Sequence, residues 1–135
     1  MNNNTTTIKE IERRSNYFYE EGFACGPISR AVVETEIVVE DNGEKVYLHG
    51  QWIDAVADEI LFEATKESIY AVYIKLNDAD DELFDTLIAE RDRIEADKID
   101  DDTRYEPFYE ELKRMIIKEL EMQGYGNPFE EEEDE

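Results

Sequence analysis

The chain has 135 residues, of which 14 are Lys or Arg and 37 are Asp or Glu, so its formal net charge is −23. Hydrophobic residues make up 41 % of the chain, which is too many for a fully disordered acidic protein, and the length is sufficient to bury a core. The charge argues against direct binding to nucleic acid or anionic lipid, which needs clustered Lys and Arg, and no apolar run approaches the roughly 20 residues that cross a bilayer.

The first residues are polar and uncharged, without the basic and apolar start of a secretory signal. Cys25 is the only cysteine, so an intrachain disulfide is not possible. Both features favour a cytoplasmic protein. We expect residues 1–7 to be a disordered N-terminus, residues 8–129 to form a single acidic domain, and residues 130–135 to be a disordered acidic tail.

The N-terminal part of the domain is predicted to be a short helix over residues 8–19, where apolar side chains recur on one side at helical spacing. Thr6 or Thr7 is placed to cap its start, and Glu10 follows Thr7 at the spacing of a capping box. Turn-forming residues then end this element: Gly22, Gly26 and Pro27.

The next two segments predict a β-hairpin. Residues 31–40 alternate between apolar side chains and glutamates, which is typical of a strand with one polar face, and residues 45–53 alternate in the same way. Asn42 and Gly43 lie between them and favour the tight turn of a hairpin because both tolerate positive φ.

Residues 54–67 are compatible with a helix or a strand. We favour a strand near 59–65, followed by a further strand over 68–76, because that segment is rich in β-branched and aromatic residues. The expected sheet is therefore an antiparallel meander of three or four strands.

Two helices are predicted in the C-terminal half. The first begins at Asn77 or Asp78 with acidic residues in its first turn, where the helix dipole favours negative charge. The second has Pro107 in its first turn and runs to about Gln123, before a glycine-containing stop. The fold class is α+β: a three- or four-stranded antiparallel sheet with a short N-terminal helix and two C-terminal helices packed on one face.

No catalytic motif stands out among these elements. His49, the only histidine, is expected to be a strand residue at the surface, and Cys25 a small apolar filler, since neither has a partner at a catalytic spacing. An EF-hand loop starting at Asp78 would need Gly at its sixth position, where Leu83 stands. We expect no enzyme activity, no cofactor and no metal site, and we interpret Asp100–Asp102 as a solvated loop.

The uneven charge is the informative feature. Residues 78–135 contain 23 acidic and 7 basic residues, against 14 and 7 in residues 1–77. Carboxylates on the outer face of a helix can imitate the regular charges of a nucleic-acid backbone. The candidate partner-binding residues form a row in this half: Asp78, Asp80, Asp81, Glu82, Asp85, Asp92, Glu95, Asp97, Asp100, Asp101 and Asp102.

In length, acidity and layout the chain resembles the small inhibitors of phages and mobile elements that mimic DNA, of the anti-CRISPR or antirestriction class. The resemblance covers the whole chain but includes no diagnostic motif. It implies an inhibitor that binds the basic nucleic-acid groove of a DNA-binding enzyme, such as an RNA-guided nuclease, and blocks its substrate DNA. The alternative is a non-catalytic adaptor recognised through its sheet edge, Tyr47 or Tyr70, whose acidity serves only solubility.

Overall fold

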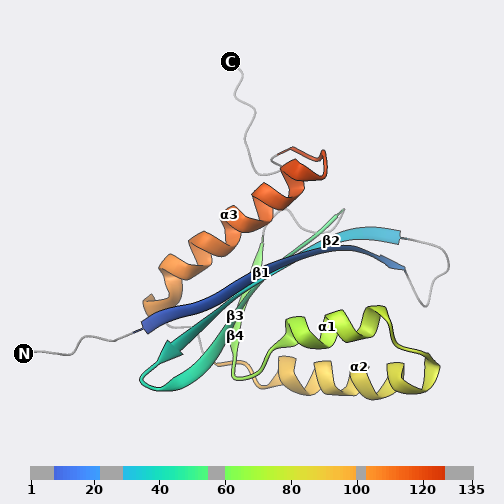
Figure 1. Cartoon of the computed structure of the whole chain (residues 1–135), viewed down its shortest axis with the longest axis horizontal. Coiled ribbons are helices and arrows are strands. Elements are labelled where there is room, and N and C mark those ends of the chain that lie inside the picture. The colour runs from blue at the N-terminus through green and yellow to red at the C-terminus, as the bar shows by residue number, and fades with distance from the viewer. Residues whose placement is uncertain (1–7, 22–28, 55–59, 100–102, 127–135) are drawn as a thin grey trace, which may run out of the picture.

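Four antiparallel strands form one sheet in chain order, and helices lie on both of its faces (Figure 1). The computed structural model describes residues 8–21, 29–54, 60–99 and 103–126. Its elements are β1 (Ile8–Glu21), β2 (Ser29–Asp41), β3 (Glu44–Ile53), β4 (Leu61–Thr65), α1 (Ile69–Asn77), α2 (Asp81–Ala96), the 3₁₀ turn η1 (Thr103–Tyr105) and α3 (Glu106–Met122). The chain is therefore an α+β protein, as predicted.

The hairpin of β2 and β3 is confirmed. Asn42 and Gly43 connect the strands with φ values of 56° and 86°, which a two-residue turn of this type requires. Asp41 lies opposite Glu44, and this register places Ile37 beside Leu48 on one face. The short strand β4 completes the sheet beside β3, close to the predicted strand over 59–65.

One face of the sheet packs against α3 and holds most of the apolar core. Alternate residues of β2 and β3, including Ile37 and Leu48, are buried against Leu112 and its neighbours one and two turns along α3. Gly50 permits this close packing, because a Cβ there would lie 3.2 Å from Leu112 Cβ and 3.1 Å from Thr35 Oγ1.

The opposite face of the sheet is covered by the hairpin of α1 and α2, which lie side by side in Figure 1. Ile69 and Val72 of α1 contact Leu87 and Ile94 of α2 in a small apolar cluster of their own. The expectation that both C-terminal helices pack on one face is therefore wrong, because α2 and α3 lie on opposite sides of the sheet.

The predicted helix over 8–19 is also wrong, since this segment is the edge strand β1, paired with β2 along its length. A bulge between Glu10 and Glu12 shifts the alternation of side chains by one residue. Both faces of the strand also contact helices: Tyr17 packs towards α3 and Phe18 lies beside Tyr73 of α1. Together these features give apolar residues at spacings that resemble a helix. Thr6 and Thr7 lie outside the described residues.

The predicted strand over 68–76 is helix α1. Ser68 caps it, and its hydroxyl accepts a hydrogen bond from the backbone N–H of Ala71 at 3.2 Å. Ile69, Tyr70 and Val72 are buried, because the sheet covers one side of α1 and α2 another. A helix that is buried on several sides needs many apolar residues, and here these are β-branched and aromatic, which favours a strand in the sequence. Packing against the sheet and α2 outweighs this local β-propensity.

Both predicted C-terminal helices are present, but the predicted start of the first at Asn77 or Asp78 is wrong, because Asn77 and Asp78 end α1 and α2 begins at Asp81. Asp80 and Asp81 stand at the start of α2, and Pro107 lies in the first turn of α3, which ends at Met122. Gly124 follows with a φ of 92°, a conformation that glycine adopts readily after a helix. Within the described residues, no helix is long and apolar enough to cross a membrane.

Candidate acidic binding surface

The start of α2 concentrates acidic side chains for a local physical reason. Asp80 is the N-cap, and its Oδ1 accepts a hydrogen bond from the backbone N–H of Leu83 at 3.0 Å. Asp81 and Glu82 occupy the first turn, where the unpaired N–H groups of the helix favour negative charge. The Asp80 carboxylate thus stabilises the start of the helix, whereas the carboxylates of Asp81 and Glu82 are exposed to solvent.

The exposed face of α2 is opposite the side that packs on α1. Leu87 and Ile94 are buried against α1, so side chains half a turn away point outwards. Four exposed carboxylates, one at the C-cap of α1 and three in the first half of α2, have no cation within 4 Å among the described residues, and we call them the acidic face: Asp78, Asp81, Glu82 and Asp85.

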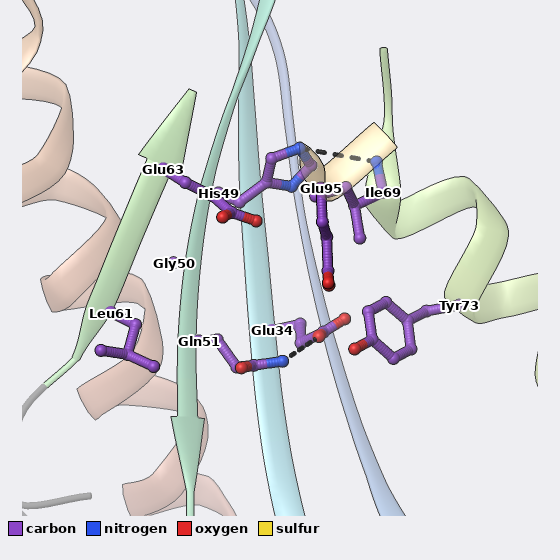
Figure 2. A pocket seen from close by; sticks show the side chains of 9 residues that line it. All are labelled: Glu34, His49, Gly50, Gln51, Leu61, Glu63, Ile69, Tyr73 and Glu95. Carbon is purple, nitrogen blue, oxygen red and sulfur yellow. Dashed lines mark hydrogen bonds between the residues drawn. The ribbon is translucent and has the colours of Figure 1, made fainter. Parts of the chain in front are cut away.

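The remaining candidates are placed differently. Asp92 is exposed but lies 3.2 Å from Arg91, and Asp97 is exposed at the C-cap of α2. Glu95 is half-buried and turns towards the sheet, so it does not belong to the acidic face (Figure 2). Asp100, Asp101 and Asp102 lie outside the described residues.

The two arginines of α2 lie in its second half and contact groups other than the acidic face. Arg93 forms ion pairs with Glu90 and Glu67, and these hydrogen bonds raise the pKa of its guanidinium. Arg91 lies over the ring of Tyr73, 5.6 Å from its centroid, on the side of α2 that meets α1. The first half of α2 therefore keeps an excess of negative charge.

A second acidic region lies between the sheet and the helical hairpin, in a cavity of about 230 Å³. Figure 2 shows its polar lining, which comes from both helices of the hairpin and three strands of the sheet. Gln51 Nε2 donates a hydrogen bond to Glu34 Oε2 on one side. Burial and the nearby Glu95 raise the pKa of Glu63, although Lys98 lies 3.6 Å from it.

Beside this cavity a buried polar network joins the sheet to α1. Glu36 is fully buried and accepts a hydrogen bond from Ser68 Oγ at 2.6 Å, while Arg14 Nη1 lies 2.9 Å from its other oxygen. Burial raises the pKa of Glu36, and Ser68 and Arg14 oppose that rise. His49 Nδ1 is 3.5 Å from Glu36, and its Nε2 accepts from the backbone N–H of Ile69 at 3.5 Å.

The prediction that His49 lies at the surface is wrong, since only 8 % of it is exposed. Burial lowers the pKa of His49 to about 3, so its imidazole is neutral at physiological pH and serves as a hydrogen-bond acceptor for α1. Tyr70 is also unavailable as the predicted adaptor contact, because it is buried and its hydroxyl donates to Ser15 O at 2.7 Å.

The sequence did contain a signal for this buried network. Strand alternation places Glu34 and Glu36 on one face of β2, and the hairpin register sets them opposite Gln51 and His49. That face was interpreted as solvent-exposed because it is polar. The cover over it was missed because its first helix, α1, was predicted as a strand.

The described residues contain no group of three or more His, Cys, Asp or Glu side chains arranged to hold a metal ion. Searches of protein-family models, curated proteins and solved structures found no match to this chain.

Proposed function

We propose that this protein is an acidic nucleic-acid mimic, which binds the basic nucleic-acid groove of a DNA-binding enzyme, such as a CRISPR nuclease, and blocks its substrate DNA. The observation that carries the proposal is the acidic face at the end of α1 and the start of α2, with four exposed carboxylates and no cation within 4 Å among the described residues. The anti-CRISPR and antirestriction inhibitors of phages are the class that this chain resembles, and the proposed role needs no catalytic chemistry.

The spacing of the acidic face supports the same proposal. An α-helix rises about 1.5 Å per residue, so Asp81 and Asp85 lie roughly 6 Å apart along the axis of α2. A duplex carries one phosphate per about 3.4 Å of each strand. The spacing of Asp81 and Asp85 is thus within a factor of two of the phosphate spacing of one strand, and a rigid helix holds it.

The energetics of such a contact depend on how its charges are paired beforehand. A carboxylate already held by a cation gains little from a new basic partner, whereas an unpaired one gains a favourable interaction. The total charge of −23 adds long-range attraction to a basic groove and accelerates association. Asp80 is left out of the variants, because it also caps α2 and its replacement would disturb the helix.

The proposal is tested by competition for DNA. Labelled target DNA is bound to each of a panel of RNA-guided nucleases and restriction enzymes, and the chain is added at increasing salt. We expect the chain to displace DNA from its target enzyme, with an inhibitory concentration that rises as salt screens the charges.

A matched pair of variants locates the surface. Asp78→Lys, Asp81→Lys and Asp85→Lys together should abolish displacement. Three reversals of the same total charge on α3 should retain most of it: Glu106→Lys, Glu110→Lys and Glu121→Lys, which are all exposed. Equal loss in both variants, or DNA binding that the chain leaves unchanged across the panel, would contradict the proposal.

A second candidate is an adaptor module that binds through apolar side chains. Its support is the exposure of Leu83 on α2 and Ile74 on α1, at 47 % and 42 %. This function predicts a partner whose binding is insensitive to salt and is lost in Leu83→Ser, while the triple reversal on α2 leaves it intact.

A further inference from the structure

The cavity between the sheet and the helical hairpin is large enough to hold a small ligand. Its volume is about 230 Å³. For comparison, an apolar cavity of about 150 Å³ inside a protein holds a benzene molecule. Leu61 and Glu63 of β4 line the cavity and are partly exposed, which indicates an opening to solvent along this short strand. A ligand can therefore reach the cavity from the β4 side.

The charged side chains that line the cavity are carboxylates from three separate elements. Glu34 belongs to β2, Glu63 to β4 and Glu95 to α2, and Figure 2 shows them around one space. His49 also lines the cavity, but it adds no positive charge at physiological pH, because burial lowers its pKa to about 3. The lining is therefore suited to a cation.

The cations near this lining are few, and each has a carboxylate of its own. Lys98 Nζ lies 3.6 Å from Glu63 and offsets that charge from the solvent side, where Lys98 is largely exposed. Arg91 Nη2 lies 3.2 Å from Asp92, which is not part of the lining. Arg14 is held in the buried polar network behind the cavity.

An excess of negative charge remains after these pairs are counted, and Glu95 is its clearest source. No cation of the described residues lies within 4 Å of Glu95. Deeper in the cavity, Glu34 is only 6 % exposed and accepts a hydrogen bond from the neutral amide of Gln51. Carboxylates shielded from water are costly unless positive charge or hydrogen-bond donors compensate them. A cation in the cavity would provide both.

The shape of the lining selects among cations. The described residues contain no group of three or more acidic, His or Cys side chains close enough together to hold a metal ion. A guanidinium group is larger and planar, donates several hydrogen bonds in different directions, and stacks on aromatic rings. Tyr73 supplies such a ring at the wall of the cavity. We propose that the cavity binds the guanidinium group of an organic cation, with Glu95 and Glu34 as its acceptors and Tyr73 against its plane.

The guanidinium group can come from two sources, a free guanidine compound or an arginine side chain of a protein partner. In both cases the site is separate from the acidic face, none of whose residues lines the cavity. The proposal therefore does not depend on the proposed function, and either can fail alone.

Two-dimensional NMR of the full-length chain tests the proposal with three small probes: methylguanidinium, methylammonium and methylurea. Methylurea has nearly the shape of methylguanidinium but no charge. We expect methylguanidinium to cause saturable shifts of the amide peaks of Gln51, Glu63 and Tyr73 and to leave the exposed face of α3 unchanged. Methylammonium should bind more weakly, and methylurea should cause no saturable shift. No saturable shift with methylguanidinium would mean that the cavity holds only water and would overturn the proposal.

A matched pair of variants locates the bound group. Glu95→Gln should weaken methylguanidinium binding by roughly tenfold or more, because it removes one charged acceptor. Glu121→Gln makes the same change at an exposed position on α3 and should bind like the wild type. Equal binding by Glu95→Gln and the wild type would overturn the proposal. Binding of methylurea or methylammonium as tight as that of methylguanidinium would also overturn it, and this comparison needs no variant.

A fourth probe distinguishes the two sources of the group. Arginine capped as its N-acetyl N-methylamide imitates an arginine within a protein chain. If it shifts the same peaks and binds at least as tightly as methylguanidinium, the opening accommodates a backbone and the ligand is a side chain of a partner. If it binds much more weakly, the ligand is a free guanidine compound.

Discussion

The two faces of the sheet are held by different chemistry. On the α3 face, β2 and β3 meet α3 through aliphatic side chains such as Ile37, Leu48 and Leu112, all with no exposed surface. On the other face, Ser68 at the N-cap of α1 donates a hydrogen bond to Glu36 of β2, whose buried carboxylate also pairs with Arg14 of β1.

The apolar packing on the α3 face therefore drives folding, whereas the polar contacts on the other face position the helices that carry the acidic face. Burial of apolar area is the dominant favourable contribution to folding, so the α3 face should set the global stability. The polar contacts orient the hairpin of α1 and α2, whose apolar contacts are a small cluster of its own and the ring pair of Tyr73 with Phe18 of β1. Regions with fewer apolar contacts open at a lower free energy than the rest of the molecule.

The largest effect is expected on the α3 face. Leu112→Ala leaves a cavity against Leu48 and Gly50, and should lower the free energy of unfolding by about 2–5 kcal/mol. Urea denaturation followed by circular dichroism measures this loss. A loss below about 1 kcal/mol would mean that the site relaxes to fill the cavity, and would contradict the assignment of this face as the main core.

A smaller effect is expected on the polar face, from Arg14→Met. Removal of the guanidinium leaves the Glu36 carboxylate buried without its cation. The cost should be roughly 2 kcal/mol at neutral pH, below the 3–5 kcal/mol of a fully buried pair because Arg14 is 30 % exposed. Hydrogen exchange should show the added opening in α1 and α2 before β2 and β3.

The pH dependence of this variant has a definite sign. Burial raises the pKa of Glu36, and the loss of Arg14 raises it further. A carboxyl whose folded pKa lies above its unfolded value favours folding at low pH, and that contribution is lost as pH rises through the folded pKa. The deficit of Arg14→Met should therefore shrink on acidification. Adding Glu36→Gln should restore part of the stability at neutral pH, and no restoration would show that Arg14 acts through its packing on Tyr70 instead.

The contrast between the faces also explains what the sequence could predict. The strands β2 and β3 and their turn were predictable because each strand has one apolar face and Asn42-Gly43 fixes the connection. The helices α2 and α3 were predictable from caps and spacing. The hairpin and the two helices are thus both determined by residues close together in the sequence.

The errors arise where long-range contacts override those rules. β1 carries a bulge and is covered on both faces, so its alternation is obscured. In α1, Ile69 and Val72 are buried on several sides and resemble a strand. Of the predicted partner-binding residues, Asp78, Asp81, Glu82 and Asp85 are exposed, whereas Glu95 turns into the cavity beneath α1 and α2. No local pattern distinguishes an outward carboxylate from one aimed at a neighbouring element.

The titration of His49 tests how the polar face contributes to the free energy of unfolding. Its folded pKa of about 3 lies below the unfolded value near 6.5, so the neutral imidazole stabilises the fold at higher pH. This contribution is fully present above pH 6.5 and is lost as pH falls towards 3, at about 1.4 kcal/mol per pH unit. Between pH 6.5 and 5, His49→Gln should show a shallower decline in unfolding free energy than the wild type. Equal slopes would contradict the burial of a neutral imidazole.

The smallest effect is expected on the acidic face, where the fold makes no use of the charges. Asp85→Asn should change the free energy of unfolding by less than about 0.5 kcal/mol, because Asp85 is exposed and has no cation within 4 Å among the described residues. Asp80→Ala, five residues earlier on the same helix, should cost about 1 kcal/mol, because its carboxylate caps α2. The pair is compared by urea denaturation at low and high salt. If Asp85→Asn lowered the free energy of unfolding as much as Asp80→Ala, the Asp85 carboxylate would have a structural partner, and the acidic face would contribute to folding.

If the two variants differ as expected, Asp85 can be altered in binding experiments without disturbing α2. Any loss of DNA displacement in the charge-reversal variant would then report on recognition alone.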